Sequence, residues 1–256
     1  MSSMKSNITA VVLTHNEEKS IKKCLASLSW CGEVLVIDDM SEDDTVSLAE
    51  KAGSRIIKHK LNDDFASQRN FAIGEAQGDW VLFVDADEEV PLSLSYEILS
   101  YTSDPMNTYD GFYLKRQDVL WGKKLMHGET ASVRLLRLAK KNAGTWNGPV
   151  HETWKITGKT RALRGELLHY PHQNTVSFLK EINWYTDMRA KELYMQKKHV
   201  KGLQIFLFPA GKFVTNYFLR LGVLDGIPGL IEAVMMSFHS FLVRGKLWQL
   251  WQNASV

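Results

Sequence analysis

The stretch WVLFVDADEEV (residues 80–90) contains the pattern on which the reading of the chain depends. Four apolar residues at positions 81–84 have the character of a buried strand, and four acids follow within five positions, Asp85, Asp87, Glu88 and Glu89. Two carboxylates at positions i and i+2 can present oxygens to one hard cation such as Mg²⁺ or Mn²⁺. A solvated surface turn has the same local pattern, so the neighbouring segments must distinguish the two interpretations.

Strand-like and helix-like segments alternate through the first hundred residues. This alternation predicts an α/β fold, a Rossmann-like and mostly parallel sheet with helices on both faces. In such sheets ligands bind beyond the carboxyl ends of the strands. The predicted strands are ITAVVLT (8–14), EVLVIDD (33–39), SRIIKH (54–59) and DWVLFVDAD (79–87), and the predicted helices are EKSIKKCLASLS (18–29), SEDDTVSLAEKAG (41–53) and DFASQRNFAIGEAQG (64–78).

The pattern of predicted strands and helices changes from about residue 109. Longer, irregular strands are predicted at 109–122 and 132–141, and the segment GTWNGPVHETW (144–154) reads as rich in loops. From about residue 176 the pattern is helical to the end, with KFVTNYFLRLGVL (212–224) presenting one apolar helix face. We therefore expect a domain at 1–175, with a first half at 7–100 and a second half at 101–175, followed by a helical segment at 176–256.

Charge, cysteine content and hydropathy narrow the class of protein. Residues 1–100 carry 18 acids and 9 bases, whereas residues 101–256 carry 11 acids and 22 bases. The acidic half could hold a metal, and the basic half could face an anionic surface. The two cysteines, Cys24 and Cys31, are expected to be reduced in a cytoplasmic protein. We expect no signal peptide at the N-terminus and no stretch approaching the roughly 20 apolar residues that span a bilayer.

Several nucleotide chemistries are excluded because their motifs are missing. The sequence has no G-x-G-x-x-G after the first strand, no G-x-x-x-x-G-K-[ST] and no G-x-S-x-G. Arg69 is a candidate site residue, because the helical pattern places its charged side chain on the inner face of the helix, together with Phe65, Ala72 and Ile73. A buried guanidinium requires an anionic partner, which is either an aspartate of the chain or a ligand diphosphate.

Four motifs together resemble the nucleotide-sugar domain of family 2 glycosyltransferases, the GT-A fold. They are VVLTHNEE (11–18), VLVIDDMSEDDT (34–45), ASQRNFAI (66–73) and WVLFVDADEEV (80–90), in the order and approximate spacing of that family. The resemblance implies a nucleotide-diphosphate sugar donor, usually a UDP-sugar, and a divalent metal, Mg²⁺ or Mn²⁺. It also implies that Thr14, His15 and Glu17 lie at the uridine-binding strand end, although His15 stands where the family often has Tyr.

The same resemblance assigns roles to four further residues of the first half. Asp39 matches the aspartate that contacts base or ribose, with helix capping as its alternative role, and Arg69 matches the arginine near the diphosphate. In the D-x-D motif, Asp85 matches the ribose side and Asp87 the metal ligand. Glu88 and Glu89 are expected to support the site or to be solvated, without a catalytic role.

The later half is expected to supply a catalytic base. An inverting transfer needs a carboxylate that takes a proton from the acceptor hydroxyl. Similar family members carry a His-Glu pair here, matched by His151 and Glu152, and we expect Glu152 to be the base. Trp146 and Trp154 flank it and are expected to contact sugar faces. His169 could be a further metal ligand, although a hydrogen-bonded structural histidine is the competing interpretation.

Three C-terminal sequence segments resemble the lipopolysaccharide core glucosyltransferases that add glucose to the inner-core heptose. They are NWYTDMRAKEL (183–193), KFVTNYFLRLGVLDGIPGL (212–230) and KLWQLW (246–251). This likeness implies inverting transfer of a hexose, most often glucose, from a UDP-sugar to a lipid-linked saccharide. From Lys197 onward there are 7 bases and 2 acids interleaved with aromatic and aliphatic residues, a pattern typical of helices that lie on anionic bilayers.

Partners and location follow from this interpretation as expectations. We expect a peripheral protein at the cytoplasmic face of the inner membrane, with no nucleic-acid partner. A tail that packs on its own domain or forms a homodimer is the alternative. For the reaction, a polyprenyl-phosphate sugar transferase with the same donor site is the nearest alternative, and an inactive membrane-bound scaffold is the non-enzymatic one.

Overall fold

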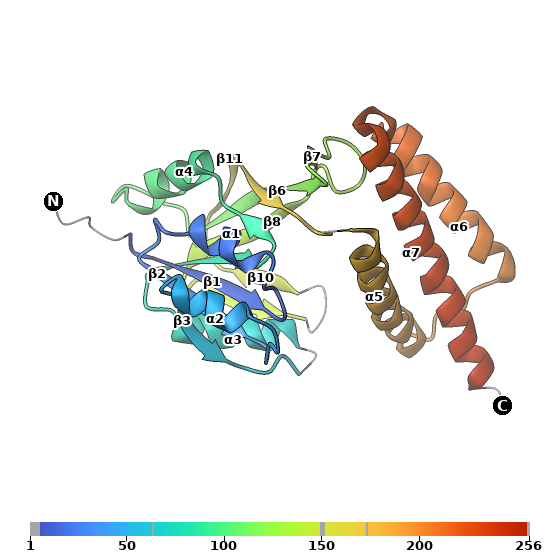
Figure 1. Ribbon diagram of the computed structural model, residues 1–256, viewed down its shortest axis with the longest axis horizontal. Coiled ribbons are helices and arrows are strands. Elements are labelled where there is room, and N and C mark those ends of the chain that lie inside the picture. The colour runs from blue at the N-terminus through green and yellow to red at the C-terminus, as the bar shows by residue number, and fades with distance from the viewer. Residues whose placement is uncertain (1–5, 63, 149–151, 173, 255–256) are drawn as a thin grey trace. The chain divides into compact units, whose positions relative to one another are not determined.

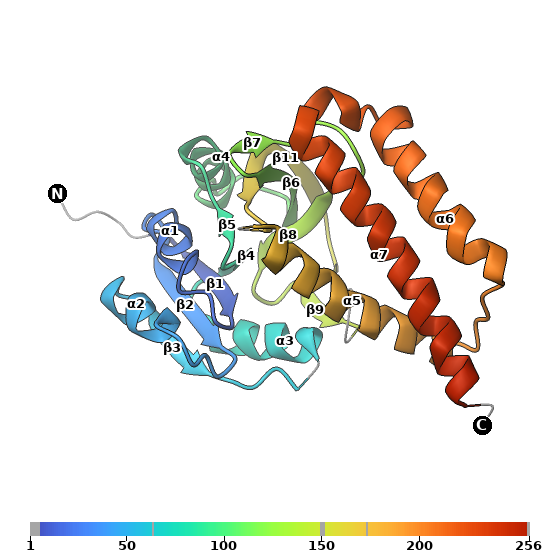
Figure 2. The same cartoon turned by 45° about the vertical axis from the view of Figure 1, so that its right-hand side comes forward.

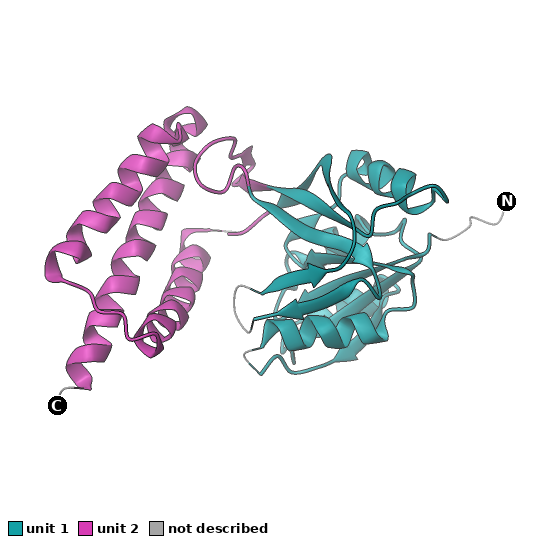
Figure 3. Ribbon diagram, turned by 180° about the vertical axis from the view of Figure 1, so that it is seen from behind, with its two compact units in different colours: residues 1–116, 133–169 teal, residues 117–132, 170–256 magenta. Residues whose placement is uncertain are grey.

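The computed structural model describes residues 6–62, 64–148, 152–172 and 174–254. The chain divides into two compact units, shown in different colours in Figure 3. Unit 1 comprises Met1–Arg116 and Val133–His169, and unit 2 comprises Gln117–Ser132 and Tyr170–Val256. Each unit is built around its own secondary structure, a mixed sheet in unit 1 and long helices in unit 2 (Figure 1).

Unit 1 contains the predicted α/β sheet. Its parallel strands β1 (Ile8–Thr14), β2 (Glu33–Asp38), β3 (Arg55–Lys58) and β4 (Trp80–Asp85) have the spatial order β3-β2-β1-β4. The sheet continues through β8 (Arg134–Lys140), which is antiparallel to β4, and then β6 (Gly111–Leu120), β11 (Thr160–His169) and the short β5 (Glu88–Glu89). The predicted fold class is confirmed, with antiparallel strands added to the parallel group.

Both faces of this sheet are covered, because its central strands are apolar on both sides. In β1, Val12 belongs to a core shared with α1 (Ile21–Ala26), α2 (Thr45–Lys51) and α4 (Leu92–Thr102). The neighbouring Val11 belongs to a second core shared with α3 (Phe65–Glu75). Successive side chains of a strand point to opposite faces, so a continuous apolar run such as ITAVVLT is what a sheet buried on both faces requires.

The segment 144–154 is more ordered than predicted. It contains β9 (Gly144–Asn147) and β10 (Thr153–Ile156), an antiparallel pair in which Trp146 lies opposite Trp154. Residues 149–151 between them lie outside the described residues. The loop prediction is therefore wrong for these two strands, because their apolar side chains have a core to enter. Gly144 is required here, since a Cβ on it would lie 1.9 Å from the Lys155 carbonyl oxygen.

Unit 2 contains β7 (Lys123–Lys124), α5 (Thr175–Met195), α6 (Gly202–Val214) and α7 (Gly226–Asn253). The predicted continuous helix face at 212–224 is wrong. The α-helix ends at Val214, a π-helical turn covers Thr215–Leu219, and a 3-10 turn covers Gly222–Asp225. Leu221 adopts φ 57°, and a Cβ on Gly222 would lie 2.7 Å from the Asn216 carbonyl oxygen. The chain therefore reverses direction between α6 and α7.

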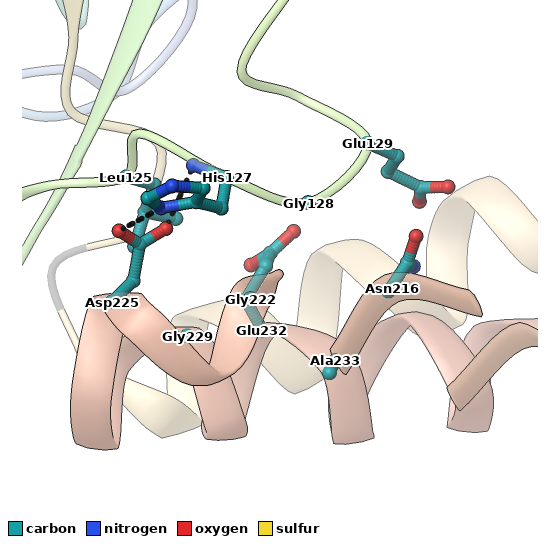
Figure 4. A pocket seen from close by; sticks show the side chains of 10 residues that line it. All are labelled: Leu125, His127, Gly128, Glu129, Asn216, Gly222, Asp225, Gly229, Glu232 and Ala233. Carbon is teal, nitrogen blue, oxygen red and sulfur yellow. Dashed lines mark hydrogen bonds and ion pairs between the residues drawn. The ribbon is translucent and has the colours of Figure 1, made fainter. Parts of the chain in front are cut away.

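Hydrogen bonds beside a small pocket connect this reversal to the loop that precedes β8 (Figure 4). The His127 backbone amide donates to Asp225 Oδ2 at 2.9 Å, and His127 Nδ1 lies 2.9 Å from Asp225 Oδ1. The Asn216 side chain lines the same pocket, is 3% exposed, and has no hydrogen-bond partner among the described residues for either its oxygen or its nitrogen. A polar cavity of this kind is suited to a buried water.

The last helix does not agree with the expectation that no stretch of the sequence is long and apolar enough to span a membrane. The stretch Gly222–Asn253 is long and apolar enough to cross a bilayer by length and composition, whereas no such stretch was expected. The stretch also contains charged residues such as Glu232 and Arg244. The same test is passed by core helices of soluble proteins, so this finding alone does not assign a membrane span.

Candidate active site

The candidate site lies at the carboxyl ends of three neighbouring strands of unit 1. In the sheet register, Thr14 at the end of β1 pairs with Asp38 on β2, and Leu13 pairs with Asp85 on β4. The strand order changes direction next to β1, which is flanked by β2 and by β4. Parallel sheets bind ligands at such positions, because the connecting loops separate to either side and leave a crevice.

Asp85, the first acid of D-x-D, is held by two buried arginines. Arg69 Nη2 and Arg137 Nη1 each lie 3.2 Å from Asp85 Oδ1, and Arg137 Nη2 also donates to Oδ2. Arg69 and Arg137 are each 5% exposed. Burial would raise the pKa of the Asp85 carboxyl, but the guanidinium charges of Arg137 and Arg69 outweigh it and hold that pKa well below its usual range. Asp85 is therefore an ionised and rigidly oriented carboxylate.

Arg69 also connects this carboxylate to Glu152. Its Nε donates to Glu152 Oε1 at 2.9 Å, so one guanidinium contacts acids 67 residues apart in the sequence, Asp85 and Glu152. Its planar group lies 4.7 Å from the centre of the Trp146 ring, a cation–π contact. The predicted inner-face position of Arg69 is confirmed, and the carboxylates supply the anionic partners that a buried guanidinium requires. His151, the other member of the expected pair, lies outside the described residues.

Trp146 and Trp154 do not have the role expected for them. They are 7% and 5% exposed and stack with ring centres 5.4 Å apart. The Phe83 ring meets the edge of both, at 5.2 Å in each case. These tryptophans belong to the core beneath Arg69 and are not exposed for contact with a sugar, because Phe83 on β4 offers them an apolar surface.

Asp87 and His169 are brought together by the pairing of β5 with β11. Glu88 lies opposite His169 in that register, and the Asp87 Oδ2 atom is 3.3 Å from His169 Nε2. A carboxylate oxygen and an imidazole nitrogen are both donors that Mn²⁺ accepts. Among the described residues no group of three or more His, Cys, Asp or Glu side chains has the geometry of a metal site. The donor pair therefore fits a divalent cation whose remaining ligands come from elsewhere, such as substrate phosphates.

Glu88 is buried beneath the D-x-D turn and contacts both its backbone and Arg137. It is 1% exposed, accepts a hydrogen bond from the Asp85 backbone amide at 2.9 Å, and lies 3.5 Å from Arg137 Nη2. Burial raises the pKa of the Glu88 carboxyl to about 7; Arg137 opposes this shift and the charge of Asp85 adds to it. Glu88 thus supports the D-x-D backbone. Glu89 instead pairs with Lys23 at 2.8 Å.

The predicted uridine-side residues occupy the ends of β1 and β2. His15 is exposed, and its Nδ1 lies 2.6 Å from the Asp39 carbonyl oxygen. The Asp39 carboxylate accepts a hydrogen bond from the Leu61 amide at 2.8 Å, so it fastens the loop after β3. Thr14 is buried, and the backbone amide of Glu17 donates to Thr45 Oγ1 at 2.7 Å. The structure therefore groups Thr14, His15 and Asp39 at one edge, whereas the Glu17 carboxylate accepts a hydrogen bond from Ser20 Oγ at the start of α1.

Arg137 was missed by sequence reasoning. It lies in the middle of β8 between Leu136 and Leu138, and all three are buried. A lone basic residue inside an apolar strand is the signal that could have indicated it, because a buried guanidinium without an acid partner would be very costly. Its partner Asp85 is 52 residues away in the sequence, so local patterns do not reveal the pair.

Comparisons with known proteins give one family and several relatives. Residues 9–176 match the profile of the family described as Glycosyl transferase family 2. A protein of Rickettsia prowazekii named as an uncharacterized glycosyltransferase is 28% identical, over 95% of this chain and 87% of its own. The lipopolysaccharide core biosynthesis glycosyltransferase LpsC of Rhizobium meliloti is also 28% identical, over 94% of this chain and 92% of its own.

Solved structures give weaker likenesses. The crystal structure of S. aureus TarS 1-349 has a TM-score of 0.49 and 14% identity, and the match covers 96% of this chain and 91% of TarS. The glucosyl-3-phosphoglycerate synthase of Mycobacterium tuberculosis, solved with Mn²⁺, UDP and phosphoglyceric acid, has a TM-score of 0.47 and 14% identity, over 75% of this chain and 78% of its own.

Proposed function

The chain belongs to glycosyl transferase family 2, and from this we propose that it is an inverting transferase that moves a hexose, glucose first among the candidates, from a UDP-sugar to a lipid-linked saccharide. The observation that carries the proposal is the Arg69 guanidinium, which contacts both Asp85 of D-x-D and Glu152. A donor-side acid and a candidate base thus share one rigid cation. The similarity to LpsC supports an acceptor of the lipopolysaccharide core type.

In this proposal Glu152 acts as the general base. Its side chain is 16% exposed, and Arg69 holds one oxygen at 2.9 Å, which leaves the other oxygen for the acceptor hydroxyl. Glu152 takes the hydroxyl proton as that oxygen attacks the anomeric carbon, and the bond from this carbon to the UDP oxygen breaks on the opposite side. The anomeric configuration is thereby inverted, and UDP leaves as the anion.

Asp87 and His169 are the residues that would hold a divalent cation. Their Oδ2 and Nε2 atoms are 3.3 Å apart and supply one oxygen and one nitrogen donor. A bound cation of this kind neutralises negative charge on a departing diphosphate. Asp85, whose oxygens are occupied by Arg69 and Arg137, is assigned to orienting the turn and to the ribose, and Thr14, His15, Glu17 and Asp39 to the nucleoside side.

The proposed lipid-linked acceptor implies that the protein works at a membrane. A lipid-linked saccharide presents its sugar at a bilayer surface, so the enzyme must work as a peripheral protein, which we assign to the cytoplasmic face of the inner membrane. The helical unit supports this proposal through its exposed apolar residues and its excess of bases.

A screen of UDP-sugars with Mn²⁺ or Mg²⁺, read out as UDP release, tests the reaction class and the sugar together. In transfer assays Glu152→Gln should lower the rate by about 10²–10⁴-fold, because a general base contributes that much. Asp87→Ala should also remove most transfer. The matched control is Glu50→Gln on α2, an exposed acid that should leave the rate unchanged. Near wild-type transfer by both site variants would contradict the assignment.

The same experiment separates the nearest alternative. A polyprenyl-phosphate acceptor is already an anion and needs little base catalysis. If Glu152→Gln lowered transfer by less than about tenfold while Asp87→Ala abolished it, the polyprenyl-phosphate transferase would be favoured. If no UDP-sugar bound in the presence of metal, measured by calorimetry, the inactive scaffold would be favoured.

A further inference from the structure

The last helix of unit 2 has two sides of opposite character. Its buried residues are Gly229, Ala233, Met235, Ser240, Val243 and Leu247, and all of them except Met235 recur at helical spacing on one side. Between Ile227 and Trp248 its exposed residues recur at the same spacing, and these are large and apolar: Ile227, Leu230, Val234, Phe238, Phe241 and Trp248. In a soluble helix this outer stripe would carry polar residues. An apolar stripe on the outer side therefore indicates that something other than water covers it.

The preceding helix extends this exposed surface. None of the residues of α6, all of which the structure describes, is buried. Phe206 is 72% exposed, and in the reversal that follows, Leu219 is 73% exposed, the same value as Ile227 at the start of α7. We call the exposed side of residues 203–248 the apolar face. It includes a helix, a turn and a second helix, more than the scattered apolar side chains of an ordinary surface.

A groove lies within the apolar face. It has a volume of about 520 Å³ and is lined by Ile205, Phe206, Pro209, Phe213, Ser237 and Phe241 among others. The side-chain hydroxyl among these residues belongs to Ser237, and it already donates a hydrogen bond to the Pro209 carbonyl oxygen at 2.8 Å. Pro209 has no amide hydrogen, so it adds no donor. A groove of this size with no free polar group among these residues is suited to a hydrocarbon chain.

The other side of α7 is held by α5, a helix that carries charged side chains as well as apolar ones. Figure 2 shows α7 between α5 and α6, and α7 packs against both. Lys246 on α7 donates to Asn183 and to Thr186 Oγ1 on α5, each at 2.8 Å, and lies 2.7 Å from Asp187. Charged groups of α5 such as Asp187 cannot enter hydrocarbon cheaply. With lipid on α6 and on the outer side of α7, and with the charged groups of α5 in water, α7 would lie along the surface of a bilayer without spanning it.

The excess of bases in unit 2 indicates which kind of partner covers the apolar face. Unit 2 (residues 117–132 and 170–256) contains twelve bases and seven acids, a count that includes Glu129 and Asp187, which pair with Lys212 and Lys246. A second copy of the chain would bring the same excess of bases against itself, whereas an anionic leaflet complements it. Arg244 illustrates the arrangement at the border of the face: its guanidinium lies 4.0 Å from the Phe208 ring centre, and burial lowers its pKa from the usual range.

We propose that the apolar face is a membrane-insertion surface that embeds in the acyl region of an anionic phospholipid leaflet, with the groove occupied by an acyl chain. The proposal deepens the proposed function by naming the part of the chain that meets the membrane. It does not depend on the donor, because binding to vesicles is measured without UDP-sugar. Failure of the transfer assay and failure of vesicle binding are thus separate results.

Vesicle co-sedimentation of the full chain tests the proposal. Vesicles of phosphatidylethanolamine with phosphatidylglycerol should bind the wild type, and phosphatidylcholine vesicles should bind it more weakly. Leu219→Glu and Ile227→Glu should each weaken binding by about tenfold or more, since burial of such a side chain contributes at least the 1.4 kcal/mol that corresponds to a factor of ten. The matched control is Leu92→Glu, whose side chain in unit 1 is 71% exposed and should not alter binding.

Three results would overturn the proposal. Equal binding by the wild type and both face variants would show that the apolar face does not touch lipid. A wild-type dimer in light scattering that Leu219→Glu dissociates, without vesicle binding, would assign the face to a second copy. Binding only to vesicles that contain lipopolysaccharide would assign the groove to the acceptor lipid. Thermal melting of each variant, expected to match that of Leu92→Glu, verifies that the loss is not due to unfolding.

Discussion

Replacing Arg137 by Met is the sharpest test of the arrangement around Asp85. Arg137 is 5% exposed, donates to both oxygens of Asp85 and lies 3.5 Å from Glu88. Met has a similar length and no charge, so the substitution leaves little empty space, while Asp85 keeps only Arg69 as its cation and Glu88 loses Arg137. Removing one partner of a buried ion pair costs about 3–5 kcal/mol, because the remaining charge stays buried and uncompensated.

A surface arginine provides the matched control. Arg55 also bridges two acids, with Nη1 3.1 Å from Glu33 and Nη2 2.6 Å from Glu75, but its side chain is 37% exposed. Exposed pairs contribute about 0–1 kcal/mol, since water and salt screen them. Arg55→Met should therefore cost several-fold less than Arg137→Met. The difference between the two variants isolates the effect of burial, because each removes a guanidinium that bridges two carboxylates.

Urea denaturation followed by circular dichroism measures both variants. Arg137→Met should lower the free energy of unfolding by about 3–5 kcal/mol and the melting temperature by roughly 6–20 °C. The double variant Arg137→Met with Glu88→Gln should recover about 1 kcal/mol, because one stranded acid is removed. If Arg137→Met cost no more than Arg55→Met, the argument that Asp85 is fixed by a buried cation would be wrong.

Two further changes test the surroundings of the site. The folded-state pKa of Glu88 is raised from 4.5 to about 7, so the wild type should lose about 3 kcal/mol of stability between these pH values in the presence of chelator, and Glu88→Gln should not; equal pH profiles in urea denaturation would refute this. Trp154→Ala should cost about 3–5 kcal/mol of stability, since the ring is 5% exposed and stacked on Trp146. The exposed Trp184→Ala should cost under about 1 kcal/mol in the same thermal melts.

The first half of the fold was predictable because its signals are local. Strand-length apolar runs alternate with amphipathic segments, and the polar residues that follow the strands fall at one edge once the strands are parallel. Arg69 could be placed on the inner face of its helix, because a helix with period 3.6 shows which residues share a side. Its buried position agrees with that periodicity, whereas its contact with Asp85 depends on the packing of α3 on the sheet.

The parts that could not be predicted depend on contacts between distant residues. A lone base inside β8 marks Arg137 as unusual, but the strand pattern does not reveal its partner Asp85, which is 52 residues away. The strands β9 and β10 have four residues each and are stabilised by Phe83, which is distant in sequence. The end of α6 is set by the close approach of Gly222 to Asn216, which a helical apolar pattern conceals.

The Lys246 ammonium also has a consequence for the purified protein. By contacting Asn183, Thr186 and Asp187, it fixes the rotation of α7 about its own axis. A helix free to roll could turn its outer side inward when no membrane is present. Locked in this way, α7 keeps Phe238 and Phe241 in water, so the chain should self-associate as salt weakens the repulsion between its bases. Mild detergent should keep it dispersed at salt concentrations where it otherwise precipitates.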